Sequence, residues 1–399
     1  MQICPEALFT LGRLEEHGYT AYLVGGCVRD FIMDKVPYDF DITTNATPDK
    51  IEECFSDIRT LDVGKKHGTI TLVFESMNIE VTTYRIDGEY KDSRHPESVT
   101  FTDRIEDDLA RRDFTINAIA YSPKRGFVDP FGGREDIEKR IIRCVGEPSK
   151  RFDEDALRIM RGIRFSARFG FEIEENTLCA MKEKRNLLLN ISKERIHSEL
   201  SRTLCEKFFF MPVFRTIDVF YTIMPFMKHV DFAALEKTSA NNSLYVRLGI
   251  LLYCLAGDKR LKEKLHGLKF DNATINRFCD TMLYLPECVG KCTDFDVKKA
   301  VSEIGYLSAC DLYEILYCKT SESVYSDALI RLREFHEASV CMSIKQLSVK
   351  GNEIIEKYSI HPSQTGKILS CLLDEVMKDE IPNEKAALLD AAEKYISMS

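Results

Sequence analysis

The sequence predicts an α+β protein, with a mixed-sheet head over about the first 145 residues and an all-α remainder. Three observations predict this division. Short segments of alternating apolar and polar residues are interspersed with helical segments up to about residue 120. From about residue 150, strand signals almost vanish and a helical spacing of apolar residues continues. A chain of 399 residues is also too long for one core, so two or more domains are expected.

The head is expected to contain four strands with the alternation of half-buried strands. The expected strands are residues 21–24, 38–44, 68–75 and 77–85. Gly25 and Gly26 should turn the first strand into a helix that begins near Cys27. Thr47 should cap a further helix that begins at Pro48.

Helices and one long polar segment complete the head. Residues 5–18 suit a helix before the first strand. Residues 86–98, IDGEYKDSRHPES, interrupt the pattern for long enough to form a functional loop. Residues 108–122, DLARRDFTINAIAYS, are predicted to form one helix, and residues 127–140 a turn that leads into another.

Composition is that of an ordinary globular protein, with 44% hydrophobic and 30% charged residues. No apolar run approaches the length that spans a bilayer, and no signal peptide is evident. The 14 cysteines are scattered without a CxxC pair, which predicts reduced thiols and a cytoplasmic location. A net charge of -9 argues against a general nucleic-acid coat but allows a local basic surface.

Two acids lie on one face of the second expected strand. Asp39 and Asp41 should point the same way, while Phe40 and Ile42 point into the core. Carboxylates this close repel one another unless a cation neutralises them, and such oxygen ligands suit Mg²⁺ together with substrate phosphates. For the pair alone, a solvated acidic strand face is the simpler interpretation.

Neighbouring residues favour the metal site. Glu80 would be a third carboxylate at the site if its strand pairs beside the strand of the two aspartates. Gly25 and Gly26 should leave backbone N–H groups at a helix N-terminus, which attract phosphate, and Arg29 follows in the first turn. Together these residues predict a metal site that faces a phosphate-binding turn.

Four segments, in this order and spacing, resemble the motifs of one family. They are LVGGCVRDFIMDKVPYDFDITT, DLARRDFTINAIAY, FVDPFGGREDI and RFDEDALRIMRGIRF. The family is that of the class II tRNA nucleotidyltransferases, the bacterial and eukaryotic CCA-adding enzymes, which share their head with bacterial poly(A) polymerases. The resemblance is close over residues 20–200 and looser beyond them. It implies a head of the DNA polymerase β-like nucleotidyltransferase type, followed by a helical neck, body and tail.

The resemblance implies a part for each segment and a role for each matching residue. The expected parts are a catalytic head (1–145), a nucleotide-recognising neck (146–215), a body (216–310) and a tRNA-binding tail (311–399). Asp39 and Asp41 match the catalytic pair that binds Mg²⁺, and Glu80 would be the third catalytic carboxylate. The residues expected to bind the nucleotide are Gly25, Gly26, Arg29, Arg112, Asp155, Arg158, Arg161 and Arg164.

The last four of these residues are spaced three apart, which would form a ridge on a helix. A carboxylate accepts from the amino group of cytosine or adenine, and a guanidinium donates to ring acceptors. Uracil lacks that amino group, so Asp155 and Arg158 could select C and A without a template. Arg161 and Arg164 would then follow the ligand toward its triphosphate. A basic helix face in solvent is the simpler alternative.

The implied function is the template-independent addition of CCA to the 3′ end of tRNA from CTP and ATP with two Mg²⁺ ions. Within the family, an A-adding or CC-adding enzyme or a poly(A) polymerase are the alternatives. Residues 85–97 fill the place of a flexible loop that CC-adding relatives lack, which favours full CCA addition. The acidic pI of about 5.6 favours a tRNA enzyme.

Two alternatives come from outside the family. The first is an RNA-binding protein with an inactive head, although the acids and the glycine turn are all present. The second is nucleotide transfer to a protein or an antibiotic, which would leave the ridge without a role. No membrane partner is expected, and the oligomeric state does not follow from the sequence.

Overall fold

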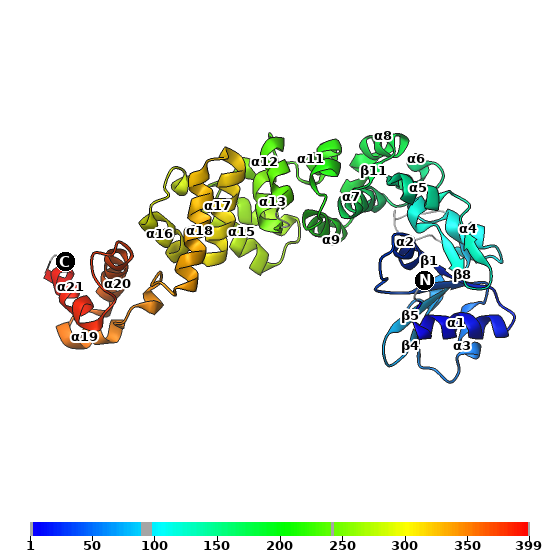
Figure 1. The fold of residues 1–399 in the computed structure, drawn as a ribbon, viewed down its shortest axis with the longest axis horizontal. Coiled ribbons are helices and arrows are strands. Elements are labelled where there is room, and N and C mark those ends of the chain that lie inside the picture. Colours follow the sequence, from blue (N-terminus) through cyan, green and yellow to red (C-terminus); the bar gives the residue numbers. More distant parts are fainter. Residues whose placement is uncertain (1–2, 89–97, 241–242, 398–399) are drawn as a thin grey trace. The chain divides into compact units, whose positions relative to one another are not determined.

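The structure, a computed structural model, describes residues 3–88, 98–240 and 243–397. The chain divides into two compact units, and the boundary between them along the chain lies between Pro225 and Phe226. The first unit contains the sheet and helices up to α11, and the second is helical (Figure 1). The predicted fold class, a mixed-sheet head before a mostly helical remainder, is therefore confirmed.

A seven-stranded mixed sheet with the order β3-β4-β5-β2-β1-β8-β9 forms the centre of the head. Its strands are β1 (Ala21–Val24), β2 (Asp41–Thr44), β3 (Thr60–Leu61), β4 (Thr69–Val73), β5 (Asn78–Thr83), β8 (Ala120–Ser122) and β9 (Gly126–Val128). β2 and β5 run parallel, and the other neighbouring pairs are antiparallel. The β2–β5 register sets Asp41 opposite Glu80.

Five α-helices accompany the sheet. They are α1 (Pro5–Glu16), α2 (Gly26–Ile32), α3 (Pro48–Cys54), α4 (Ile105–Ala110) and α5 (Gly133–Lys139). Thr47 is the N-cap residue of α3 and Pro48 begins it, as expected. The glycine pair likewise leads directly from β1 into α2.

Residues 108–122 form three elements, so the prediction of one helix was wrong. α4 ends at Ala110, the 3₁₀ turn η2 covers Thr115–Asn117, and β8 begins at Ala120. The backbone hydrogen-bonding groups of this segment pair with other parts of the head instead of with one another. Phe114 forms a β-bridge with Cys144, and β8 pairs with β1. Most apolar residues of this segment are buried, and pattern alone does not distinguish that burial from a helix face.

Two short pairs of strands lie outside the main sheet. β6 (Arg85–Asp87) and β7 (Val99–Phe101) are antiparallel and flank the expected loop, of which residues 89–97 lie outside the described residues. β10 (Ile141–Ile142) and β11 (Glu172–Ile173) are parallel and join the end of the head to the neck.

The neck consists of six short or medium helices. They are α6 (Pro148–Glu154), α7 (Leu157–Phe169), α8 (Glu175–Lys184), α9 (Lys193–Leu204), α10 (Phe210–Arg215) and α11 (Ile217–Ile223). Helix α7 is buried along nearly its whole length. A Cβ on Gly162 would lie 2.7 Å from the Phe114 ring and 2.4 Å from Met181, so glycine permits the close packing of α7 on the head.

The second unit begins with α12 (Phe232–Lys237) and ends with α21 (Lys385–Ser397). Between them lie α13 (Leu244–Leu251), α14 (Leu261–Gly267), α15 (Asn272–Cys288), α16 (Asp294–Ile304), α17 (Tyr306–Thr320), α18 (Ser323–Glu337), α19 (Gly351–Tyr358) and α20 (Pro362–Met377). The boundary expected at residue 310 falls inside α17.

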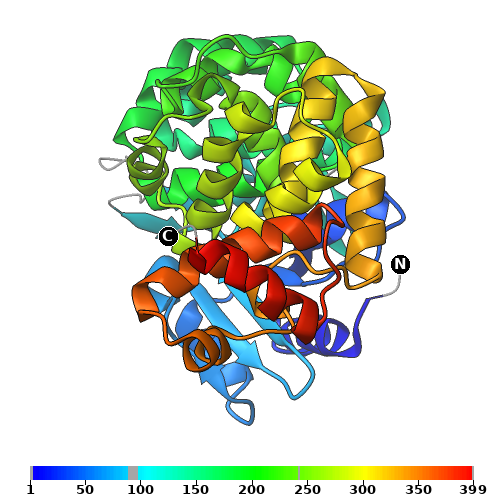
Figure 2. The same cartoon turned by 90° about the vertical axis from the view of Figure 1, so that its left-hand side faces the viewer.

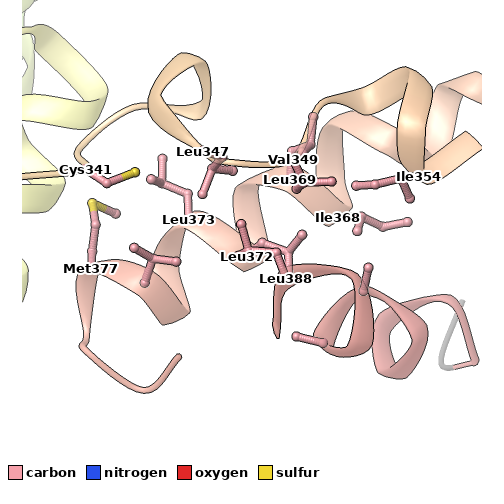
Figure 3. Close-up of a cluster of buried hydrophobic side chains, with 13 residues drawn as sticks. Cys341, Leu347, Val349, Ile354, Ile368, Leu369, Leu372, Leu373, Met377 and Leu388 are labelled. Atoms are coloured by element: carbon pink, nitrogen blue, oxygen red, sulfur yellow. The ribbon is translucent and has the colours of Figure 1, made fainter. Parts of the chain in front are cut away.

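Helices α19 to α21, coloured orange to red in Figure 2, share a separate hydrophobic core. Leu372 and Leu388 lie at its centre, and the loop before α19 contributes Leu347 and Val349 (Figure 3). The Lys298 ammonium of α16 is buried and donates to the Met377 carbonyl oxygen at 3.0 Å, which attaches this core to the preceding helices.

The 14 cysteines are thiols, as their scattered spacing predicted. Within the described part of the chain, no helix has both the length and the apolar character needed to cross a membrane.

Candidate active site

Three carboxylates gather where β2 begins. Asp41 is the first residue of β2, and the parallel register places it beside Glu80 of β5. Asp39 lies two residues earlier, just outside the strand, and is exposed. Phe40 and Ile42 are buried, so the alternation of inward apolar and outward acidic residues is present. The structure thus brings Asp39, Asp41 and Glu80 together.

The electrostatics of this cluster favour a bound cation. Burial raises the pKa of Asp41 to about 6, and the negative charges of Asp39 and Glu80 contribute to the rise. The charge of Arg112 acts in the opposite direction. The neighbouring negative charges that raise the pKa of Asp41 will also favour a hard divalent ion, and carboxylate oxygens are the ligands that Mg²⁺ prefers.

The protein supplies only part of a coordination shell. Among residues 3–88, 98–240 and 243–397, no three potential ligands converge closely enough to hold a metal ion by themselves. Mg²⁺ is commonly bound by one or two carboxylates together with substrate phosphates. The chemistry of the acids therefore fits an ion that arrives with a nucleotide.

The turn between β1 and α2 depends on glycine. Gly25 has φ 77° and ψ −128°, a conformation that side chains rarely allow. A Cβ on Gly25 would lie 3.0 Å from Nη1 of Arg112, so the missing side chain also makes room for that guanidinium. Helix α2 then begins at Gly26 without a side-chain cap. Arg112 and the glycine turn are therefore direct neighbours.

Arg29 is buried behind this turn and is already paired. Its Nε donates to Asp30 at 2.8 Å and its Nη1 to Oδ1 of Asn117 at 2.5 Å. Asn117 in turn donates to Asp113 at 3.0 Å, and Arg161 of α7 donates to the other oxygen of Asp113 at 2.6 Å. A continuous polar network thus links the glycine turn to the neck.

Two members of this network, Asp113 and Asn117, were not predicted as site residues. Both lie in the DFTIN segment, where an acid and an amide four residues apart could have suggested a shared contact. The pattern of this segment predicts a helix that does not form, and a helix would not reveal that Asn117 bonds Arg29 while Asp113 bonds Arg161.

The predicted ridge begins two residues before helix α7. Asp155 lies between α6 and α7 with an extended backbone, and its Oδ1 accepts from the backbone N–H of Leu157 at 3.0 Å. Its Oδ2 accepts from Arg195 of α9 at 2.8 Å. The carboxylate is therefore held in place, and each of its oxygens can still accept a second hydrogen bond.

The arginines of the ridge also have protein partners. Arg158 is buried and donates to Glu154 at 2.7 Å and to the Arg111 carbonyl oxygen at 3.0 Å. Arg164 is buried against Glu199 of α9 at 2.6 Å. Glu154, Glu199 and Arg195 could not have been identified from spacing, because acids and bases are frequent throughout these helices.

Comparisons with known proteins match most of the chain. The family model described as Poly A polymerase head domain matches residues 21–143. The model described as probable RNA and SrmB-binding site of polymerase A matches residues 170–210. The model described as tRNA nucleotidyltransferase domain 2, putative, matches residues 247–392.

Curated relatives match over nearly their full length. The CCA-adding enzyme of Staphylococcus saprophyticus is 44% identical over 394 residues, which is 95% of this chain and 95% of that protein. The CCA-adding enzyme of Staphylococcus haemolyticus is 33% identical over 395 residues, or 97% of this chain and 96% of that protein.

Solved structures agree in fold. The CCA-adding enzyme of Bacillus stearothermophilus, in complex with CTP, has a TM-score of 0.77 at 30% identity and covers 99% of both chains. The Thermotoga maritima CCA-adding enzyme complexed with tRNA has a TM-score of 0.75 at 21% identity and covers 98% of this chain and 96% of that one.

Proposed function

The chain belongs to the family of CCA-adding enzymes, and from that premise we propose how its residues carry out the reaction. The enzyme adds C, C and A to the 3′ end of tRNA from CTP and ATP, and protein side chains rather than a template select each base. The observation that carries this function is the match to curated CCA-adding enzymes along nearly the whole of both chains.

Asp39 and Asp41 are proposed to hold Mg²⁺, with Glu80 as the third carboxylate. Bound there, Mg²⁺ would lower the pKa of the attacking hydroxyl and neutralise charge on the phosphates. Two observations support this role: the strand register that joins Asp41 to Glu80, and the raised pKa of Asp41.

In the proposed reaction, the 3′-hydroxyl of the RNA releases its proton to solvent, and its oxygen forms a bond to the α-phosphorus of CTP or ATP. The bond from that phosphorus to the oxygen bridging to the β-phosphate breaks, and pyrophosphate leaves. The N–H group of Gly26 and the guanidinium of Arg112 bind the triphosphate. Gly25 lines the same site, and its own N–H donates to the Ile119 carbonyl oxygen at 3.4 Å. Arg29 contributes positive charge behind the turn, where Asp30 and Asn117 fix its orientation.

Asp155 and Arg158 are proposed to select the base. The Asp155 carboxylate accepts from the amino group of cytosine or adenine, and Arg158 donates to a ring acceptor. The present partners orient both side chains, Arg195 for Asp155 and Glu154 for Arg158, and leave further acceptor and donor positions for the base. Arg161 and Arg164 continue toward the phosphates, held by Asp113 and Glu199.

The four expected parts remain our proposal for the division of labour, with the tail, residues 311–399, binding tRNA. We also place the enzyme in the cytoplasm, where its thiols would stay reduced.

The test uses purified protein, Mg²⁺ and tRNA transcripts that end at the discriminator base, at C, or at CC. CTP and ATP are supplied separately and together, and products are resolved at single-nucleotide length. We expect three added residues on the shortest transcript, two on the next and one A on the longest, with no growth after A.

Other product patterns would contradict full CCA addition. Incorporation on one transcript class alone would indicate a CC- or A-adding enzyme, and a long adenylate ladder would indicate a poly(A) polymerase. Folded protein that binds tRNA without incorporating nucleotide would indicate an RNA-binding module.

A further inference from the structure

We infer that Asp108 is a positioning residue that holds the Arg112 guanidinium against the glycine turn and away from the carboxylates of Asp41 and Glu80. The inference rests on the proposed role of Arg112 in binding the triphosphate. It adds a residue to the reaction that makes no contact with nucleotide or metal.

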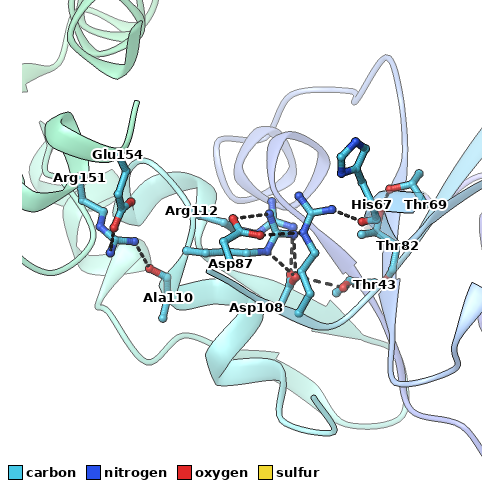
Figure 4. Close-up of polar contacts among 12 residues, drawn as sticks. Thr43, His67, Thr69, Thr82, Asp87, Asp108, Ala110, Arg112, Arg151 and Glu154 are labelled. Atoms are coloured by element: carbon cyan, nitrogen blue, oxygen red, sulfur yellow. Dashed lines mark hydrogen bonds and ion pairs between the residues drawn. The ribbon is translucent and has the colours of Figure 1, made fainter. Parts of the chain in front are cut away.

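Asp108 lies on α4 and its carboxylate is fully buried. Its Oδ1 accepts from Nε and Nη2 of Arg111, at 3.0 and 2.7 Å. Its Oδ2 faces Nη2 of Arg112 and the hydroxyl of Thr43, each at 3.4 Å (Figure 4). Thr43 is on β2, two residues beyond Asp41, so Asp108 approaches the catalytic strand from the neighbouring element.

The charge of Asp108 is retained despite its burial. Burial raises the pKa of Asp108, but the charges of Arg111 and Arg112 outweigh that effect, so its pKa is lowered overall. The two hydrogen bonds from Arg111 already neutralise one negative charge. The contact with Arg112 adds to the stabilisation of the Asp108 charge, and it also ties the Arg112 guanidinium to α4.

Arg112 lies between two sets of anions. Its Nη1 adjoins Gly25, and its positive charge lowers the proton affinity of Asp41. Its Nε is buried and has no hydrogen-bond partner among the described residues, so this group is not fixed by neighbours. The 3.4 Å contact with Asp108 is long for a charge-assisted hydrogen bond, which lets the guanidinium shift toward a phosphate.

Arg112 is also attracted to Asp41, because its charge opposes the rise in the pKa of that carboxyl group. When the charge of Asp108 is lost, this attraction would draw Arg112 toward the catalytic carboxylates. An ion pair between Arg112 and Asp41 would occupy the acid that we propose for Mg²⁺, and it would also remove Arg112 from the triphosphate. Asp108 thus competes with Asp41 for Arg112 and keeps both residues available.

The test is Asp108→Asn in the full-length enzyme, with CTP addition to tRNA measured over a range of CTP and Mg²⁺ concentrations. We expect the KM for CTP to rise about tenfold, since the charge-assisted contact of Arg112 with the triphosphate is weakened. We expect kcat at saturating CTP and Mg²⁺ to change by less than about threefold. The Mg²⁺ concentration for half-maximal rate should rise several-fold.

The double variant Asp108→Asn with Arg112→Gln separates positioning from a structural role. Removal of Arg112 removes the competing cation, so the Mg²⁺ requirement should return close to the wild-type value while the KM for CTP stays high. A defect caused by distortion of α4 would persist in the double variant, and that result would overturn the inference.

Asp107→Asn is the matched control, because it removes the same charge from the same helix. Asp107 accepts from Thr102 at 2.9 Å, and we expect its substitution to leave both the KM and the Mg²⁺ requirement unchanged. Unchanged values for folded Asp108→Asn would overturn the inference.

If Asp108→Asn does not fold, Asp108→Glu keeps the charge and displaces it by one methylene. This variant should raise the KM for CTP and leave the Mg²⁺ requirement normal, because the negative charge that holds Arg112 away from Asp41 is retained. An unchanged KM for CTP would contradict the inference. The proposed function has a separate criterion, which is whether the wild-type enzyme adds CCA.

Discussion

Burial, strand register and neighbouring charges together determine the properties of Asp41. Asp41 shares the β2–β5 pairing with Glu80 and lies near Asp39 and Arg112, so three charged groups act on one carboxylate. Its raised pKa means that folding disfavours the ionised form in the absence of a cation. Metal binding requires the ionised carboxylate of Asp41, whereas folding favours its neutral form, so the two requirements are opposed at this position.

Asp41→Asn should abolish nucleotide addition, with a loss of at least about a thousandfold, because the metal loses a ligand. The melting temperature without Mg²⁺ should stay the same or rise, since a neutral amide removes charge repulsion. Single-turnover incorporation and thermal melting check the two expectations. Asp62→Asn, an exposed aspartate in the same unit, is the control and should change neither value.

Gly25→Ala should impair both folding and nucleotide binding. The positive φ and the 3.0 Å approach of Arg112 predict a loss of about 1–3 kcal/mol in the free energy of unfolding. The KM for CTP should rise because the guanidinium is displaced. Gly12→Ala, inside α1 with open space around it, should instead stabilise by about 0.5–1 kcal/mol. Equal melting temperatures for the two variants would contradict this prediction.

Among the elements, those with strong periodicity could be predicted from the sequence. The four expected strands correspond to β1, β2, β4 and β5, and the two aspartates and Glu80 followed from their alternation. Pairs of two or three residues, such as β10 with β11, could not be predicted, because so short a ladder needs no alternation. The partners of the arginines were equally hidden, since they lie up to 88 residues away along the chain.

Asp113 joins elements of the head and the neck. Burial alone would raise the pKa of Asp113, but the charge of Arg161 and the hydrogen bond from Asn117 bring it down to about 2. A carboxylate with a lowered pKa stabilises the fold above its unfolded value of about 3.9, and this stabilisation is lost as the pH falls toward 2.

Asp113→Asn should therefore lower the free energy of unfolding at pH 7 by about 2 kcal/mol. The difference from wild type should shrink below about pH 4 and vanish near pH 2. Urea unfolding followed by far-UV circular dichroism is suitable, because the chain has no tryptophan. Asp153→Asn removes an exposed ion pair with Lys184 and should cost less than about 1 kcal/mol. A deficit for Asp113→Asn that is independent of pH would contradict the assignment.

For the whole molecule, the net charge of -9 means that binding to tRNA depends on local positive surfaces within a repulsive average field. Contacts between such surfaces and phosphates release counterions when RNA binds, so they weaken steeply as salt rises.

Raising KCl from 50 to 200 mM should therefore raise the KM for tRNA by at least about tenfold. The KM for CTP should change much less, because CTP makes few contacts and is accompanied by Mg²⁺. Steady-state kinetics at fixed free Mg²⁺ checks both values. A tRNA KM that does not depend on salt would show that binding is not governed by phosphate contacts.

The pairing of β10 with β11 limits how the gene can recombine. One strand of this pair precedes residue 145 and the other follows it, and α7 packs on Phe114 of the head through Gly162. A crossover between related genes near residue 145 would combine the head of one protein with the neck of another, and the packing surfaces of those two parts would not have evolved together. A crossover near Pro225 would leave these contacts intact. In descent, and in any engineered chimera, head and neck should therefore be exchanged as a single cassette.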